Sequence, residues 1–190
     1  AAGEALYCDD IPRHENELYV ALVLSSKAHA KIISINASEA LKQPGVHAFF
    51  SAKDLDEKQN NVGTIFKDEE LFKSDKITSH GQILGAIVAD NQSIAQRAAR
   101  LVRVETEDIT PIILTIEDAI EHNSTLTSPY PKEVISGDYK KAFEEADHVA
   151  EGEVRIGGQE HFYLETQSVI AAPKDVDELE IFASTQQPCE

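Results

Sequence analysis

The side chains best suited to chemistry gather near the carboxyl end of the sequence, starting with the stretch IGGQEHFYLETQ at residues 156–167. This stretch places amides, carboxylates and a histidine close together. Four of its side chains could take part in acid–base chemistry or hydrogen-bond a bound group: Gln159, Glu160, His161 and Glu165. The pair Gly157-Gly158 would allow a sharp turn or a close approach of the backbone to a neighbour.

A second interpretation of the same stretch is structural. Phe162, Tyr163 and Leu164 would then pack in a core, and the polar groups around them would hydrogen-bond to neighbouring backbone. The residue types alone fit both interpretations.

The stretch FASTQQP at residues 182–188 is the other candidate. Its apolar start predicts a strand, and Pro188 would end that strand. Strand ends often present functional side chains. A glutamine there cannot titrate, but it can donate two hydrogen bonds without adding charge. Such a group suits the orientation of an oxo or phosphate oxygen. The alternative is an ordinary amide-rich turn.

Elements that would position these stretches follow from hydrophobic patterning. Strands are expected at 18–24, 32–35, 46–50, 82–89 and 102–107, with helices at 37–43 and from residue 94 to about 102. The apolar run LYVALVL at 18–24 is typical of a strand buried on both faces. Asn36 with Glu39 and Ser93 with Gln96 predict the helix starts. Residues 53–80 are expected to be mostly loop. This order indicates an α/β or α+β domain over residues 1–108.

Residues 109–135 are predicted to connect this domain to a second one that begins near 136. The connection contains three prolines and a short helix at 116–121. A helix capped by Asp138 should reach Ala146. Strands are expected at 148–156, 168–172 and 178–183, and Pro173-Lys174-Asp175 should form the turn between the last two.

Composition excludes several classes of function. A formal net charge of −17 opposes binding to nucleic acid or to an anionic membrane surface. No apolar run is long enough for a membrane-spanning helix. The sequence lacks the GxGxxG and GxxxxGK[ST] fingerprints of nucleotide binding and the GxSxG and HExxH motifs of hydrolases. Two cysteines, Cys8 and Cys189, are too few for a disulfide framework or a cluster of metal ligands.

Several segments, taken in order, resemble the xanthine dehydrogenase family of molybdenum hydroxylases. They are AAGEALYCDDIP, AHAKI, the stretch from GQILGAIVAD to AQRAARLV, IGGQEHFYLET and FASTQ. The resemblance runs along all 190 residues. It implies an α+β fold in which residues 1–108 form an α/β hammerhead domain and residues 136–190 begin an α/β molybdopterin-binding domain. The absence of an initiating Met and the abrupt ends lead us to expect an internal piece of a longer chain.

The resemblance also implies the activity and partners of the parent protein. Such a protein would be a homodimer, cytoplasmic or peroxisomal, that carries Mo-molybdopterin, FAD and two [2Fe–2S] clusters. It would oxidise hypoxanthine to xanthine and xanthine to urate, with NAD as the electron acceptor. The iron–sulfur clusters and FAD would bind outside this segment, and the segment alone should be inactive. Aldehyde oxidase and a non-catalytic α/β scaffold or binding module remain as alternatives.

Within this segment the resemblance assigns one cofactor contact. Gln186 matches the family's glutamine that hydrogen-bonds to the molybdenum oxo group without ligating the metal. Gln187 is its nearest competitor if the register differs by one position. Gln159, Glu160 and Glu165 would then support the site from a distance. Cys8 is expected to be a small core or surface thiol, and Cys189 receives no role.

Overall fold

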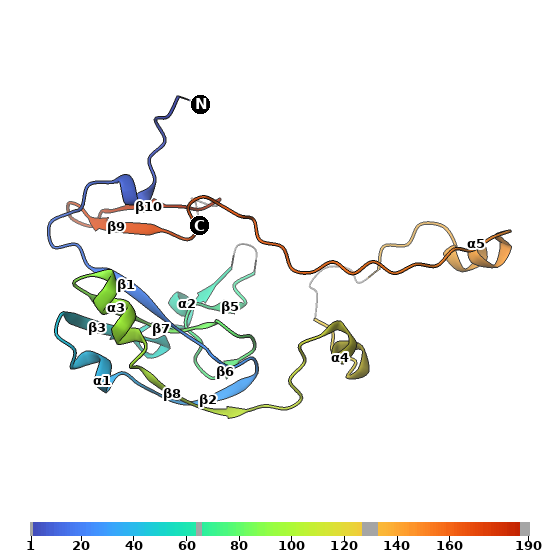
Figure 1. Cartoon of the computed structure of the whole chain (residues 1–190), viewed down its shortest axis with the longest axis horizontal. Helices are drawn as coiled ribbons and strands as arrows, with labels where there is room; N and C mark the ends of the chain where they lie inside the picture. Colours follow the sequence, from blue (N-terminus) through green and yellow to red (C-terminus); the bar gives the residue numbers. More distant parts are fainter. Residues whose placement is uncertain (1, 64–65, 127–132, 187–190) are drawn as a thin grey trace. The chain divides into compact units, whose positions relative to one another are not determined.

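The computed structural model describes residues 2–63, 66–126 and 133–186 (Figure 1). Gln187 and Cys189 therefore lie outside the described residues. The chain separates into two units, one made of Ala1–Ile112 with Glu165–Glu190 and the other of Ile113–Leu164. The described elements mix helices and strands, as expected for an α+β fold.

Two three-stranded antiparallel sheets form most of the first unit. One sheet has the order β1-β7-β3, built from Tyr19–Leu24, Ile83–Ala89 and Val46–Phe50. The other has the order β6-β2-β8, built from Lys76–Ile77, Ala30–Asn36 and Arg103–Asp108. The five strands predicted for residues 1–108 are thus confirmed, each within a few residues of its expected bounds.

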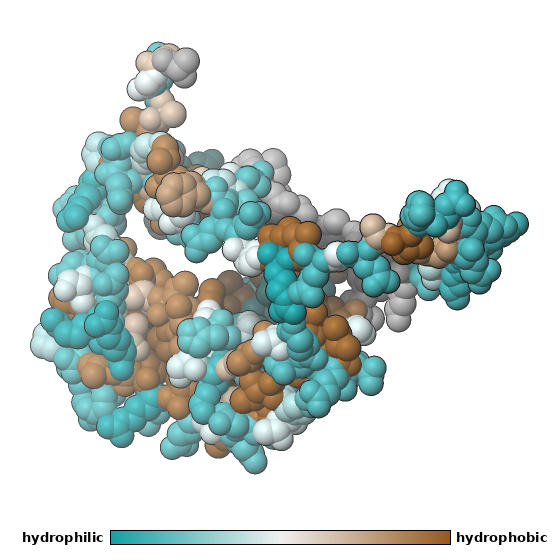
Figure 2. Space-filling view, turned by 45° about the vertical axis from the view of Figure 1, so that its right-hand side comes forward, coloured by the Kyte–Doolittle hydropathy of each residue, from teal (hydrophilic) through white to brown (hydrophobic). Residues whose placement is uncertain are grey.

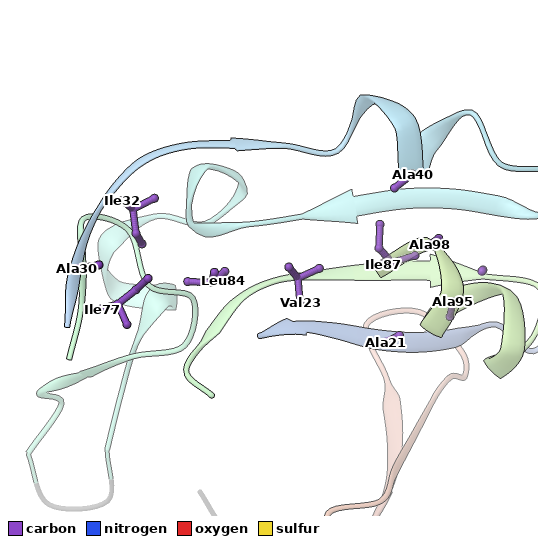
Figure 3. Packing of buried hydrophobic residues seen from close by; sticks show 11 residues of the cluster. Ala21, Val23, Ala30, Ile32, Ala40, Ile77, Leu84, Ile87, Ala95 and Ala98 are labelled. Carbon is purple, nitrogen blue, oxygen red and sulfur yellow. The ribbon is translucent and has the colours of Figure 1, made fainter. Parts of the chain in front are cut away.

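Strand β7 lies at the centre of the core. It pairs with β1 on one side and with β3 on the other, and most of its side chains are buried on both faces. The helix α3 (Gln92–Ala99) contributes the buried Ala95 and Ala98, which cluster with Ile87. Figure 3 shows this group and, farther along β7, Leu84 with Ile32 and Ile77. The core therefore joins both sheets and α3.

Strand β1 differs from its prediction of burial on both faces. Only Ala21 and Val23 are buried, whereas Val20, Leu22 and Leu24 on the opposite face are exposed. The face that carries Ala21 and Val23 packs into the core cluster, whereas the described residues leave the opposite face largely uncovered. A continuous apolar run cannot reveal this difference, because both faces of the strand carry the same residue type.

The helix caps are partly those predicted. Helix α3 begins two residues earlier than its Ser93 cap would require, because the Asn91 side chain accepts a hydrogen bond from the Ile94 backbone N–H at 2.9 Å. Helix α1 (Ser38–Leu41) has Ala37 at its cap position, and Asn36 accepts from the Ser38 N–H instead. In both places an asparagine side chain accepts a hydrogen bond from a backbone N–H at the start of the helix.

The segment predicted to be mostly loop contains several short elements. They are η2 (Ala52–Asp54), α2 (Glu57–Asn60), β4 (Asn61–Val62), β5 (Glu69–Glu70) and β6. Buried Asn60 holds this segment together: its side chain donates to the Phe72 carbonyl and accepts from the Phe72 N–H, both at 2.9 Å. These two bonds imitate a strand pairing and satisfy a buried amide.

The second unit has two capped helices and little other regular structure. Helix α4 (Ile116–Glu121) starts at Thr115, and helix α5 (Tyr139–Glu145) starts at Asp138, as predicted. The strand expected at 148–156 is absent from the described residues of this unit, where no neighbouring strand pairs with it. A strand needs such a partner to satisfy its backbone groups.

Many large apolar side chains are exposed, and Figure 2 shows several brown patches of them among hydrophilic residues. Phe162 and Leu164 are each 91% exposed, so the expectation that they pack in a core is wrong for this structure. None of the helices in the described part of the chain has the length and apolar character needed to cross a membrane.

Any side chain larger than that of glycine should destabilise β7 at position 85. A Cβ atom there would lie 2.6 Å from the Phe50 carbonyl oxygen and from the Phe49 ring. We expect Gly85→Ala to lower the free energy of unfolding by about 1–3 kcal/mol, the usual cost of overpacking. Urea unfolding of the chain, followed by circular dichroism, measures this change. Gly157→Ala is the control, since no atom in the described part of the chain lies within 4 Å of its added methyl. Equal midpoints for the two variants would contradict the prediction.

The cap of helix α4 should lose stability at low pH, because it depends on the ionised carboxylate of Asp118. Hydrogen bonding with the Thr115 side chain, then with the backbone N–H groups of Thr115 and Leu114, lowers the pKa of Asp118. Its ionised form therefore stabilises the folded cap above the ordinary aspartate pKa of about 3.9, and this support is lost as pH falls through the lower folded value. An NMR titration should show this low pKa. Thr115→Val should raise it, whereas Thr125→Val, beyond the helix, should leave it unchanged.

Candidate functional site

The candidate Gln186 follows a β-hairpin in the first unit. Strands β9 (Val169–Pro173) and β10 (Leu179–Ala183) pair antiparallel, with Ala183 opposite Val169. Both strands and the intervening turn agree with the sequence prediction. A salt bridge of 2.7 Å between Lys174 and Glu180 spans the turn end of the hairpin.

Two serines continue the pairing beyond β10. The Ser184 N–H donates to the Ser168 carbonyl at 2.9 Å, and the Ser168 N–H donates to the Ser184 hydroxyl at 2.8 Å. The backbone is therefore held until two residues before Gln186. Thr185 and Gln186 follow in an exposed position. The strand end can thus present an amide donor to a bound group.

A turn from the amino-terminal segment packs against this hairpin (Figure 1). It is the short 3-10 helix η1 (Cys8–Asp10), at the start of which the Tyr7 N–H donates a hydrogen bond to the Asp10 carboxylate at 3.1 Å. Cys8 is only 6% exposed. Its sulfur lies 3.6 Å from the Ser168 carbonyl oxygen and 3.7 Å from that of Phe182. The thiol is therefore buried between the turn and the hairpin.

Glu165 takes part in the same contact. Its Oε1 accepts a hydrogen bond of 2.7 Å from the Cys8 backbone N–H, and the side chain is half-buried. A carboxylate that accepts from a backbone amide makes a short, strong hydrogen bond. Of the four polar candidates in the stretch 156–167, Glu165 is the one that the structure brings to the hairpin bearing Gln186.

The remaining candidates of that stretch belong to the second unit. Gln159 and Glu160 are exposed in irregular backbone, and His161 stacks on Tyr163 with ring centroids 5.2 Å apart. Among the described residues, no atom lies within 4 Å of a Cβ added at Gly157 or Gly158, so neither shows the close backbone approach expected from the sequence. Gly85 makes that approach instead.

The candidate residues of the described ranges form no metal site and line no cavity that would compete with the strand end. In the described ranges, no group of three His, Cys, Asp or Glu side chains is placed to hold a metal ion. A cavity of about 760 Å³ lies along β1 and is lined mainly by that strand, α3 and β8. None of Gln159, Glu160, Glu165 or Gln186 lines it. The cavity is therefore separate from the strand-end amide.

Sequence reasoning missed the partners that fix the strand end. Ser168 and Ser184 look like ordinary polar residues, and a serine gives no signal of which distant backbone it will bond. Cys8 offered a weak signal, because cysteine is among the residue types most often buried. Nothing in the spacing showed that it would contact residues about 160 positions later.

Comparisons with known proteins identify both parts of the chain. The family model "Aldehyde oxidase and xanthine dehydrogenase, a/b hammerhead domain" matches residues 2–109. The model "Molybdopterin cofactor-binding domain" matches residues 122–190.

Full-length relatives are much longer than this chain. Xanthine dehydrogenase of Calliphora vicina is 61% identical over the whole chain, which covers 14% of that protein. Xanthine dehydrogenase/oxidase of Gallus gallus is 52% identical over 98% of the chain and 13% of its own length. Aldehyde oxidase 2 of Cavia porcellus is 47% identical over 99% of the chain and 14% of its length.

Solved structures share the fold. Quinoline 2-oxidoreductase from Pseudomonas putida 86 matches with a TM-score of 0.77 and 25% identity over 95% of this chain and 24% of its own. Aldehyde oxidoreductase from Desulfovibrio gigas matches with a TM-score of 0.73 and 26% identity over 88% of this chain and 20% of its own. From the two domain matches and the relatives together, the chain belongs to the aldehyde oxidase and xanthine dehydrogenase family of molybdenum hydroxylases.

Proposed function

We propose that this chain forms part of a xanthine dehydrogenase, which oxidises hypoxanthine to xanthine and xanthine to urate. The observation that carries the proposal is the 61% identity to a xanthine dehydrogenase across all 190 residues. Identity to an aldehyde oxidase is lower, at 47%. Purines are therefore favoured over aldehydes as substrates. The chain by itself should not turn them over, because it spans 14% of the relatives' length.

Mo-molybdopterin is the cofactor that the second family model implies. When bound, it supplies the centre that oxidises the substrate. The chemistry of the described strand end fits a contact with this group: Gln186 is exposed and carries a neutral amide donor after a backbone fixed by Ser184. A neutral donor can orient an oxygen acceptor without changing the charge of the site.

Gln186 is the residue that we propose contacts the cofactor, through a hydrogen bond from its side-chain amide to the molybdenum oxo group. It would not ligate the metal. Gln187 remains the competing position. Gln159 and Glu160 are proposed to support the site from farther away, as is Glu165, whose hydrogen bond to Cys8 gives it a structural route to do so.

The other features of the parent protein are also proposals drawn from the family. They are FAD and two [2Fe–2S] clusters outside this segment, NAD as acceptor, assembly as a homodimer, and residence in the cytoplasm or peroxisomes. The division into a hammerhead domain at 1–108, a connection at 109–135 and a cofactor-binding domain from 136 likewise stays a prediction.

Metal analysis of the intact parent protein tests the proposal most directly. We expect close to one molybdenum atom per chain, together with formation of urate from xanthine and reduction of NAD. Hypoxanthine should be oxidised faster than an aromatic aldehyde at equal concentration. A well-folded parent without molybdenum would overturn the enzyme proposal, and a preference for the aldehyde would favour an aldehyde oxidase.

Gln186→Ala should lower kcat for urate formation about 10- to 100-fold, the usual effect of removing a group that orients a metal site. Molybdenum content should stay at the wild-type level, because the amide orients the cofactor and does not anchor it. Gln92→Ala, which removes an exposed amide from α3, is the matched control. Wild-type turnover in Gln186→Ala, with loss of turnover in Gln187→Ala, would move the contact by one residue.

A further inference from the structure

We propose that Glu165 and the Cys8 turn form a clamp that positions the strand end carrying Gln186. The clamp comprises Cys8 and Glu165, together with the carbonyl groups of Ser168 and Phe182 that the thiol contacts. The inference deepens the proposed function and rests on it in one respect, the contact between Gln186 and the cofactor. The clamp itself is defined by contacts within the described chain.

The hairpin needs support from another part of the chain. An isolated two-stranded hairpin is marginally stable in water, and β9 and β10 pair only with each other among the described strands. Val169, Leu179 and Ile181 are exposed, whereas Ala172 is buried. The Cys8 turn adds contacts at the end of the hairpin from which Gln186 emerges.

Glu165 holds this turn in place. Its carboxylate accepts from the Cys8 N–H at 2.7 Å, while residue 165 is only three positions before Ser168. The charge-assisted bond therefore ties the amino-terminal turn to the backbone that leads into β9. The hydrogen bond of the Glu165 carboxylate goes to the Cys8 N–H and not to the proposed cofactor contact Gln186, so we assign Glu165 a positioning role.

The buried thiol spans the two strands. Its sulfur lies at 3.6 Å from the carbonyl oxygen of Ser168 and 3.7 Å from that of Phe182, which come from opposite sides of the hairpin. A single S–H can donate to only one of them at a time and is a weak donor. The contribution of Cys8 is therefore mainly that of a small side chain that fills the space between two strand ends.

A continuous set of contacts then leads to Gln186. The Ser168 carbonyl meets the Cys8 sulfur and also accepts from the Ser184 N–H. The Ser184 hydroxyl oxygen in turn accepts a hydrogen bond from the Ser168 N–H. Gln186 lies two residues beyond. Movement of the Cys8 turn would thus release the backbone immediately before the proposed cofactor contact.

Hydrogen exchange in the full-length parent protein, prepared with and without cofactor, tests the clamp. Glu165→Ala should speed exchange of the Cys8 and Ser184 amides about tenfold in both preparations, because a hydrogen bond to a charged group is lost. Glu165→Gln keeps an oxygen acceptor and should restore most of the protection. Glu178→Ala removes an exposed carboxylate from the turn of the same hairpin and is the matched control. Unchanged exchange in Glu165→Ala would overturn the clamp.

A double-mutant cycle separates positioning from general stability. If Glu165 acts through Gln186, Glu165→Ala should lower kcat with little effect on KM, and it should lower kcat no further once Gln186 is Ala. Fully additive losses would overturn the positioning role. If Gln186→Ala alone leaves kcat unchanged, the proposed cofactor contact fails, whereas the exchange result still decides whether the clamp exists.

Discussion

Pairing of β7 on both of its edges is the constraint on which the hammerhead part depends. This strand pairs with β1 on one edge and with β3 on the other. The buried alanines of α3 pack against it, so its backbone lies close to its neighbours. Gly85 permits that approach where Phe49 and the Phe50 carbonyl leave no room for a methyl group. On the helix side, the small side chains of Ala95 and Ala98 let α3 pack closely against the sheet.

Local signals were sufficient for elements whose determinants lie within a few residues. The turn residues 173–175 predicted the hairpin, Asp138 predicted the start of α5, and the run of apolar residues before Asp90 predicted β7. Burial was harder to predict. LYVALVL has the same hydrophobicity on both faces, so only the tertiary arrangement decides that Val20, Leu22 and Leu24 are exposed.

The site shows the same division between local and distant information. The position of Gln186 after a strand was visible in the pattern of FASTQQP, whereas its role came from the family resemblance and is still a proposal. The interpretation of Phe162 and Leu164 as core failed because no element in the described part of the chain covers them. The bond between Glu165 and Cys8 joins residues 157 positions apart, and no periodicity or motif encodes such a pair.

That separation has a consequence for biosynthesis. A ribosome that adds about 5–20 residues per second needs roughly 8–30 s to travel from Cys8 to Glu165. During this interval the β1-β7-β3 sheet can assemble from residues already made, but the amino-terminal turn lacks its binding surface. The Cys8 turn can therefore reach its final place only after Glu165 has been made, and until then it presents a thiol that the finished protein buries.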